Sequence, residues 1–300
     1  MTEQIRGFAS RRTMLAGAAS TALLALAACG KKPEKAVEAE TPAGPPKGSL
    51  EWAVAGDWRA RDKARDAARH PMETLRFFGL QPAMTVVDFW PGSGWYTEIL
   101  APYLAEGHGR YIAAGFQTGP GSAPAQGLLM EAFRKRFTAN RKLYGEIDLA
   151  AFGPTSGPVA PPNTCDLALF MRNIHAWMAA GIAEKAFADA WAALRPGGVL
   201  GIEQHRLGPG ADQDPAAANG YVQEAFVKQL AAEAGFVFVA SSEINANERD
   251  TKDYPFGVDT LPPSRLTAPR GQPPNPTFDR SKYETIGESD RMTLKFRKPE

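Results

Sequence analysis

Apolar runs of strand length alternate with amphipathic segments of helix length along most of the chain. The run at residues 166–171 is almost continuously apolar, as expected of a strand buried on both faces of a parallel sheet. Predicted strands occupy residues 85–89, 110–114, 143–152, 166–171, 199–203, 236–240 and 291–297. Predicted helices occupy residues 57–78, 96–104, 128–141, 182–194 and 221–234. This alternation predicts an α/β fold with a doubly wound, Rossmann-like sheet that is mostly parallel and ends in an antiparallel strand.

The alternation stops at about residues 245–287, which are polar and rich in proline. We interpret this segment as an insertion into one domain that spans residues 50–300, and we expect it to act as a lid on a cleft. Ligands of doubly wound sheets bind outside the carboxyl ends of the strands. The residues predicted at that edge are 88–94, 172–175 and 204–206.

The first residues have the pattern of an export signal. Arg11 and Arg12 precede an apolar run that ends at Cys29, and the run is shorter than the roughly 20 apolar residues of a membrane-spanning helix. An uncleaved anchor helix is therefore the less favoured alternative. The paired arginines resemble a twin-arginine signal, and Leu26-Ala27-Ala28-Cys29 resembles the lipobox of bacterial lipoproteins.

These resemblances predict a signal peptide at residues 1–28 and a lipidated Cys29. Residues 29–49 then form a flexible tether, because they are rich in Lys, Glu, Ala, Pro and Gly without apolar periodicity. The predicted location is the bacterial cell envelope, with the lipid anchor in the membrane. Gly30 after the cysteine is typical of sorting to the outer membrane, facing the periplasm.

Composition narrows the choice of partners. The formal net charge is +1, and the basic residues are interspersed with acidic ones, so the chain lacks the basic footprint of a nucleic-acid-binding protein. Cys165 is the one cysteine besides Cys29. It stands in an apolar run, so we expect a buried small side chain and neither a disulfide nor a nucleophile.

The strand at residues 85–89 runs into a glycine turn and then a helix. Gly92 and Gly94 allow a ligand to approach the backbone closely, and Asp88 stands at the end of the strand. A dinucleotide-binding turn would have a third glycine where this chain has Thr97, which disfavours a nicotinamide-dependent oxidoreductase.

The spacing of Asp88, Gly92 and Gly94 instead resembles motif I of the class I S-adenosylmethionine-dependent methyltransferase superfamily. Further segments resemble a group of predicted exported bacterial methyltransferases. They are Arg65-Asp66, His70-Pro71, Phe77-Phe78-Gly79-Leu80, residues 95–104, Arg172-Asn173-Ile174-His175-Ala176-Trp177-Met178, residues 194–201, His205-Arg206 and residues 290–296. The chain departs from the superfamily pattern at Trp90, which replaces a glycine.

The resemblance implies S-adenosyl-L-methionine as cofactor and a direct displacement mechanism. The predicted cofactor-binding residues are Asp88, Pro91, Gly92, Gly94, Tyr96 and Asn173. Superfamily members usually hold the ribose with a carboxylate after the second strand, where this chain has only Gln117. Trp90 and Trp95 have two interpretations, stacking on the cofactor or packing of helix against sheet.

His175 and His205 follow two strands whose ends are expected at one edge of the sheet. A histidine with a pKa near 6.5 can accept a proton from the nucleophile as the methyl group arrives, so both are candidate catalytic bases. The alternative is a structural hydrogen-bonding role. A metal site is disfavoured because no third ligand has suitable spacing.

The predicted function is methyl transfer to an unidentified small molecule or envelope component. S-adenosylmethionine is made in the cytoplasm, whereas the predicted location is outside it. A non-catalytic ligand-binding or scaffold lipoprotein on a methyltransferase fold is therefore the alternative from a different class.

Lipidation of Cys29 is directly testable. Acyl chains contribute about 0.8 kcal/mol per buried methylene, so the mature protein should fractionate with membranes, whereas Cys29→Ala should leave a soluble form. Fractionation of cells that express either form measures the difference. Unchanged membrane association of Cys29→Ala would contradict lipidation.

Overall fold

The computed structural model describes residues 44–300, in which seven strands form one sheet in the order β3-β2-β1-β4-β5-β7-β6. The strands are β1 (Thr85–Phe89), β2 (Arg110–Phe116), β3 (Ile147–Phe152), β4 (Cys165–Met171), β5 (Leu194–His205), β6 (Val237–Ser242) and β7 (Arg291–Arg297). β7 is antiparallel to both β5 and β6, and the pairs from β3 to β5 are parallel. This arrangement confirms the predicted fold class, including the antiparallel final strand.

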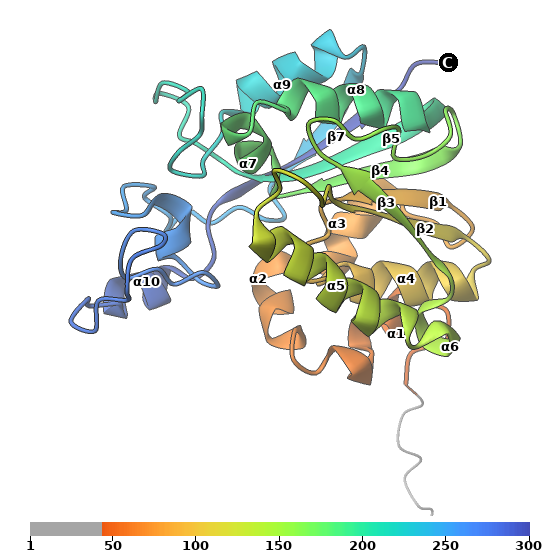
Figure 1. The fold of residues 1–300 in the computed structure, drawn as a ribbon, viewed down its shortest axis with the longest axis horizontal. Coiled ribbons are helices and arrows are strands. Elements are labelled where there is room, and N and C mark those ends of the chain that lie inside the picture. The colour runs from red at the N-terminus through yellow and green to blue at the C-terminus, as the bar shows by residue number, and fades with distance from the viewer. Residues whose placement is uncertain (1–43) are drawn as a thin grey trace, which may run out of the picture. The chain divides into compact units, whose positions relative to one another are not determined.

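Helices cover both faces of the sheet (Figure 1). One layer contains α7 (Ile174–Ala179), α8 (Ala183–Ala193) and α9 (Glu224–Glu233). The other contains α1 (Leu50–Ala55), α3 (Pro71–Phe78), α4 (Thr97–Glu106), α5 (Pro124–Thr138) and α6 (Arg141–Tyr144). The short α2 (Asp66–Arg69) and the 3₁₀ turns η1 (Asp57–Arg59) and η2 (Lys63–Arg65) precede α3.

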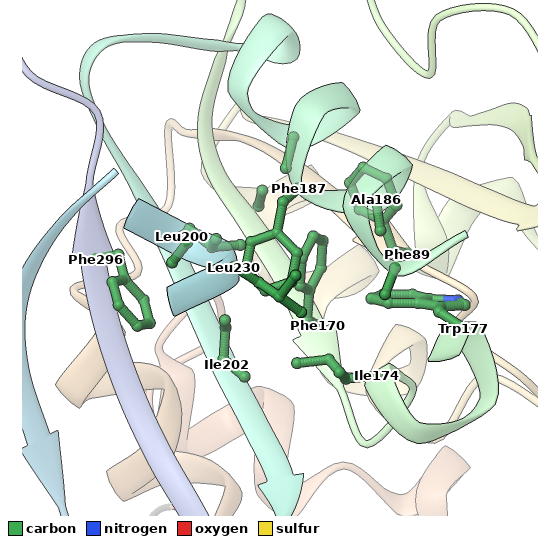
Figure 2. Close-up of a cluster of buried hydrophobic side chains, with 14 of the residues drawn as sticks. Phe89, Phe170, Ile174, Trp177, Ala186, Phe187, Leu200, Ile202, Leu230 and Phe296 are labelled. Atoms are coloured by element: carbon green, nitrogen blue, oxygen red, sulfur yellow. The ribbon is translucent and has the colours of Figure 1, made fainter. Parts of the chain in front are cut away.

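The central strand β4 shows why both layers are needed. Ala168 and Phe170 belong to the core beneath α7, α8 and α9, whereas Leu167 and Leu169 belong to the core beneath the opposite layer. Side chains alternate between the faces of a strand, so a strand covered on both sides is apolar throughout. Figure 2 shows Phe170 packed among Phe187 and other apolar side chains of the first core. Cys165 at the start of β4 is fully buried and free, as predicted.

Several local boundaries differ from the sequence-based prediction. No helix was predicted between residues 171 and 182, but α7 begins at Ile174, with the Ile174 N–H bonded to the Gln204 side chain. The turn at residues 195–198 was expected to precede a strand, but it lies within β5, whose pairing with β4 is irregular between Cys165 and Leu167.

The proline-rich segment contains η3 (Gly257–Thr260) and α10 (Ser281–Ile286). Tyr254, Leu261 and Ile286 of this segment pack with Leu207 and Tyr221 in a third, smaller core. The segment therefore has apolar anchorage of its own next to the carboxyl end of β5 and the start of β7.

Among residues 44–300, no helix combines the length and apolarity that crossing a membrane requires. The predicted signal peptide, Cys29 and most of the tether lie outside the described residues.

Packing of the first core is tested by a matched pair of leucines. Leu200 in β5 is fully buried, whereas Leu128 in α5 is 68% exposed. Leu200→Ala leaves a cavity and should lower the free energy of unfolding by about 2 to 5 kcal/mol, while Leu128→Ala should change it by less than about 0.5 kcal/mol. Chemical denaturation measures both, and equal losses would contradict the packing described here.

Candidate functional site

The site lies where the strand order changes direction. After β1 the chain builds β2 and β3 on one side, then crosses to β4 on the other, so β1 and β4 flank the switch point at which doubly wound sheets bind ligands. Asn173, the second residue after β4, donates from Nδ2 to the carbonyl oxygens of Phe89 at 2.7 Å and Trp90 at 3.3 Å. This side chain therefore joins the ends of the two strands.

The glycine turn after β1 uses the left-handed region of backbone space three times. Trp90 has φ 49°, Gly92 φ 61° and Gly94 φ 90°. A Cβ on Gly92 would meet no atom within 4 Å, whereas one on Gly94 would lie 2.2 Å from the Phe137 ring. Gly92 thus leaves open space at the site, and Gly94 allows α5 to pack against the turn.

A cavity of about 290 Å³ opens beside this turn. Pro91, Gly92, Asn173, His175 and His205 line it, as predicted for residues at this edge of the sheet. Further lining comes from segments that lie far apart in the sequence. They are Arg65, Arg69, Trp90, Ser93, Trp95, Met171, Arg172, Val258, Asp259, Pro262, Pro263, Ser264, Glu288 and Ser289.

A second cavity, of about 360 Å³, lies at the ends of β2 and β3. The Trp90 ring forms a wall common to both cavities and packs on Phe116, with ring centroids 4.4 Å apart. Trp90 Nε1 donates to the Phe152 carbonyl at 2.9 Å. Gln117 exchanges two hydrogen bonds with Thr155, donating to its Oγ1 at 2.6 Å and accepting from its N–H at 3.1 Å.

Three predicted cofactor-binding residues do not line either cavity. Asp88 is 1% exposed, and its Oδ2 accepts from Tyr111 Oη at 2.9 Å. Tyr96 is also buried, and it donates to Glu203 Oε2 at 3.1 Å. Gly94 faces α5, as described above. The side chains of Asp88 and Tyr96 therefore lie behind the cavity wall, and their part in cofactor binding stays a prediction.

The two candidate bases do meet, with ring centroids 5.3 Å apart. Gln204 Oε1 accepts from the Ile174 N–H at 3.1 Å, so its amide group points to His175 Nδ1 at 3.2 Å and donates there. His175 therefore carries its proton on Nε2 and presents a donor. Burial lowers its pKa, which keeps the ring neutral.

His205 makes a different contact. Its Nδ1 lies 2.6 Å from Ser289 Oγ, and burial lowers its pKa well below the usual value, with His175, Arg291 and Arg172 adding to the effect. A neutral imidazole that is held by one hydrogen bond and lines the cavity can accept a proton.

Four charged side chains line the same cavity and pair with two more that do not line it, in a set that we call the arginine cluster. Its members are Arg65, Arg69, Arg172, Arg291, Glu203 and Glu288. Glu288 accepts from Arg69 at 2.8 Å, and Glu203 accepts from Arg172 at 2.8 Å. The sequence analysis placed Arg65 and Arg69 in the predicted helix at residues 57–78 and did not single out either glutamate. The available signal was Glu203, a charged residue in an apolar strand.

No family model matches the chain, and neither does any curated protein. Solved structures match it in fold. A geranyl diphosphate methyltransferase in complex with SAM is 13% identical, over 82% of this chain and 94% of that one, with a TM-score of 0.51. A SAM-dependent methyltransferase from Aquifex aeolicus is 20% identical, over 63% of this chain and 90% of that one, with a TM-score of 0.48. The described chain thus has the Rossmann-like fold of class I SAM-dependent methyltransferases.

Asp88 makes stability depend on pH. Burial raises its pKa to about 7, above the unfolded value near 3.8, so the folded state binds this proton more tightly. The resulting stabilisation is complete below about pH 4 and is lost as pH rises to 7. From pH 8 to pH 5 the wild type should gain about 2 to 3 kcal/mol relative to Asp88→Asn, at 1.36 kcal/mol per pKa unit. Urea denaturation at both values measures this, and parallel pH profiles would contradict it.

Proposed function

We propose that this domain binds S-adenosylmethionine and transfers its methyl group to an acceptor. The observation that carries the proposal is the position of the first cavity, which opens on the glycine turn at the β1/β4 switch point of a methyltransferase-type sheet. A dinucleotide-dependent oxidoreductase is less favoured, because Thr97 stands where a dinucleotide-binding turn has its third glycine.

The residues present fit such a cofactor. Gly92 leaves space for close approach, and Pro91 and Asn173 shape the cavity beside it. The aromatic walls of the second cavity suit a purine ring. Gln117 would hold the ribose through the second lone pair of its oxygen, since one already accepts from Thr155.

When bound, the cofactor supplies an electrophilic methyl group. The chain would contribute positioning of the acceptor and acceptance of its proton at His205, whose lowered pKa keeps the ring neutral. His175 would donate from Nε2 to an acceptor atom of the substrate. Pro262 and Pro263 of the insertion line the cavity and would exclude water from it.

A non-catalytic binding function is the second candidate. Two observations favour it: Gln117 stands where a carboxylate is expected and is tied to Thr155, and the Trp90 ring stands between the two cavities. In this case the chain would bind a ligand without turning it over.

We also propose that the protein is a lipoprotein anchored through Cys29 in the cell envelope, facing the periplasm. Its partners would then be the membrane and a small-molecule or envelope substrate. Folding before export, as a twin-arginine signal implies, would allow cofactor to be carried out with the chain.

Calorimetric titration of the full chain in mild detergent tests cofactor binding. S-adenosylmethionine and S-adenosylhomocysteine should bind, and NAD should not. Gly92→Leu should weaken S-adenosylmethionine binding by at least about tenfold, a loss of roughly 1.4 kcal/mol, because the side chain would occupy the cavity.

Gly271→Leu is the matched control. Gly271 has φ 84° and also has no atom within 4 Å of a Cβ, but it is exposed and lines neither cavity. Both variants carry similar backbone strain, so only a cavity effect distinguishes them. Equal weakening by both, or no heat from either S-adenosyl compound with a folded protein, would overturn the proposal.

A further inference from the structure

The arginine cluster carries an uncompensated charge. Four guanidinium groups meet two carboxylates, which leaves two positive charges. Four members have side chains exposed by 8% or less, namely Arg69, Arg291, Glu288 and the completely buried Glu203. Burying net charge in a poorly solvated site is unfavourable unless a counter-charge is present.

Neighbouring groups do not supply that counter-charge. Tyr96 stays neutral, because burial and Glu203 raise its pKa well above the usual value. Asp259 lines the cavity but is paired with Arg270, whose Nε lies 3.0 Å from Oδ2. Asp66 is held by Arg59 through two hydrogen bonds of 2.7 and 2.8 Å.

Donors remain free at the cavity. Within residues 44–300, the side chains of Arg65 and Arg69 hydrogen bond only through Nε, to Glu288. Arg172 uses only Nη1, to Glu203. All three side chains line the cavity, and that of Arg69 is 4% exposed. Their remaining N–H groups are therefore available to a ligand, in the fork geometry that suits oxyanions.

Charge repulsion acts within the cluster as well. Burial, Arg172 and Arg65 outweigh Glu288 and lower the pKa of Arg69 to about 9. An anion in the cavity would relieve this repulsion. S-adenosylmethionine would not, because its one carboxylate is outweighed by an ammonium and a sulfonium, and its net charge is +1.

We propose that the arginine cluster is an anion site, and that the methyl acceptor carries a doubly charged oxyanion of the phosphate-monoester type. The acceptor role rests on the proposed function, whereas the anion site does not. Arg65, Arg69 and Arg172 would hold the anion, with the Ser289 hydroxyl as a further neighbour. His205 lines the same cavity, so the anion would place the rest of the acceptor near the candidate base.

Calorimetric titration of the full chain with inorganic phosphate tests the site, with acetate as the singly charged comparison. Phosphate should bind at least about tenfold more tightly than acetate. Arg65→Gln and Arg69→Gln should each weaken phosphate binding by roughly tenfold, as expected for lost charge-assisted hydrogen bonds. Phosphate should also raise the Tm of the wild type more than that of the variants.

Arg141→Gln is the matched control, because Arg141 is 69% exposed and lies in α6, away from the cavity. Arg65→Lys keeps the charge and should retain part of the affinity. The Arg65 side chain is 28% exposed and so tolerates substitution better than that of Arg69. If Arg69→Gln fails to fold, the Arg65 variants test the anion site on their own. Equal phosphate affinity in wild type and Arg65→Gln, or no phosphate binding by the wild type, would overturn the proposal.

Repeating the titration with S-adenosylhomocysteine present separates the two proposals. Phosphate binding without any binding of S-adenosyl compounds would support the anion site and reject the methyltransferase function. Binding of S-adenosyl compounds without phosphate binding would reject the anion site and leave the proposed function standing.

Discussion

The buried carboxylate of Glu203 ties together the elements that form the site. Glu203 lies in β5, and its Oε1 is 2.8 Å from both Arg172, directly after β4, and Arg291 at the start of β7. Its Oε2 accepts from Tyr96 of the glycine-turn segment. Burial alone would raise its pKa, but Arg172, Arg291 and Arg69 hold it below the usual value. Removing one member of such a buried network leaves the others unpaired, so the ends of three strands depend on this one charge.

The pairing of Arg172 with Glu203 also explains the backbone conformation of Arg172. This residue has φ 64°, a left-handed conformation that is costly outside glycine. Its N–H bonds to the Glu203 carbonyl at 2.6 Å, and its side chain bonds to the Glu203 carboxylate at 2.8 Å. Two bonds to one residue of β5 thus fix the turn at the end of β4. That turn places Asn173 against β1 and His175 on the cavity.

The local pattern of apolar, polar and glycine residues was enough to predict the strands, the glycine turn and the histidines at the strand ends. Each of these features depends on residues that are close in sequence. The arginine cluster could not be predicted that way, since Arg69 and Glu288 are 219 positions apart. The burial of Asp88 was not predicted either, for a different reason. Along β1, Val86 packs in the core beneath α4 while Val87 and Phe89 pack in the opposite core. Strand alternation places Asp88 on the side of Val86, facing Tyr111 and not the cavity.

Charge in the cluster and basicity at His205 are coupled. Arg291, Arg172 and Arg69 all contribute to the low pKa of His205, after burial and His175. An anion bound among these arginines would reduce their effect and raise the pKa of His205 toward its ordinary value. A histidine with a higher pKa holds an accepted proton more firmly, so it becomes a stronger base. On the proposal that the acceptor supplies this anion, binding of the acceptor would itself prepare the group that takes its proton. The net positive charge of the cavity would then serve both recognition and catalysis.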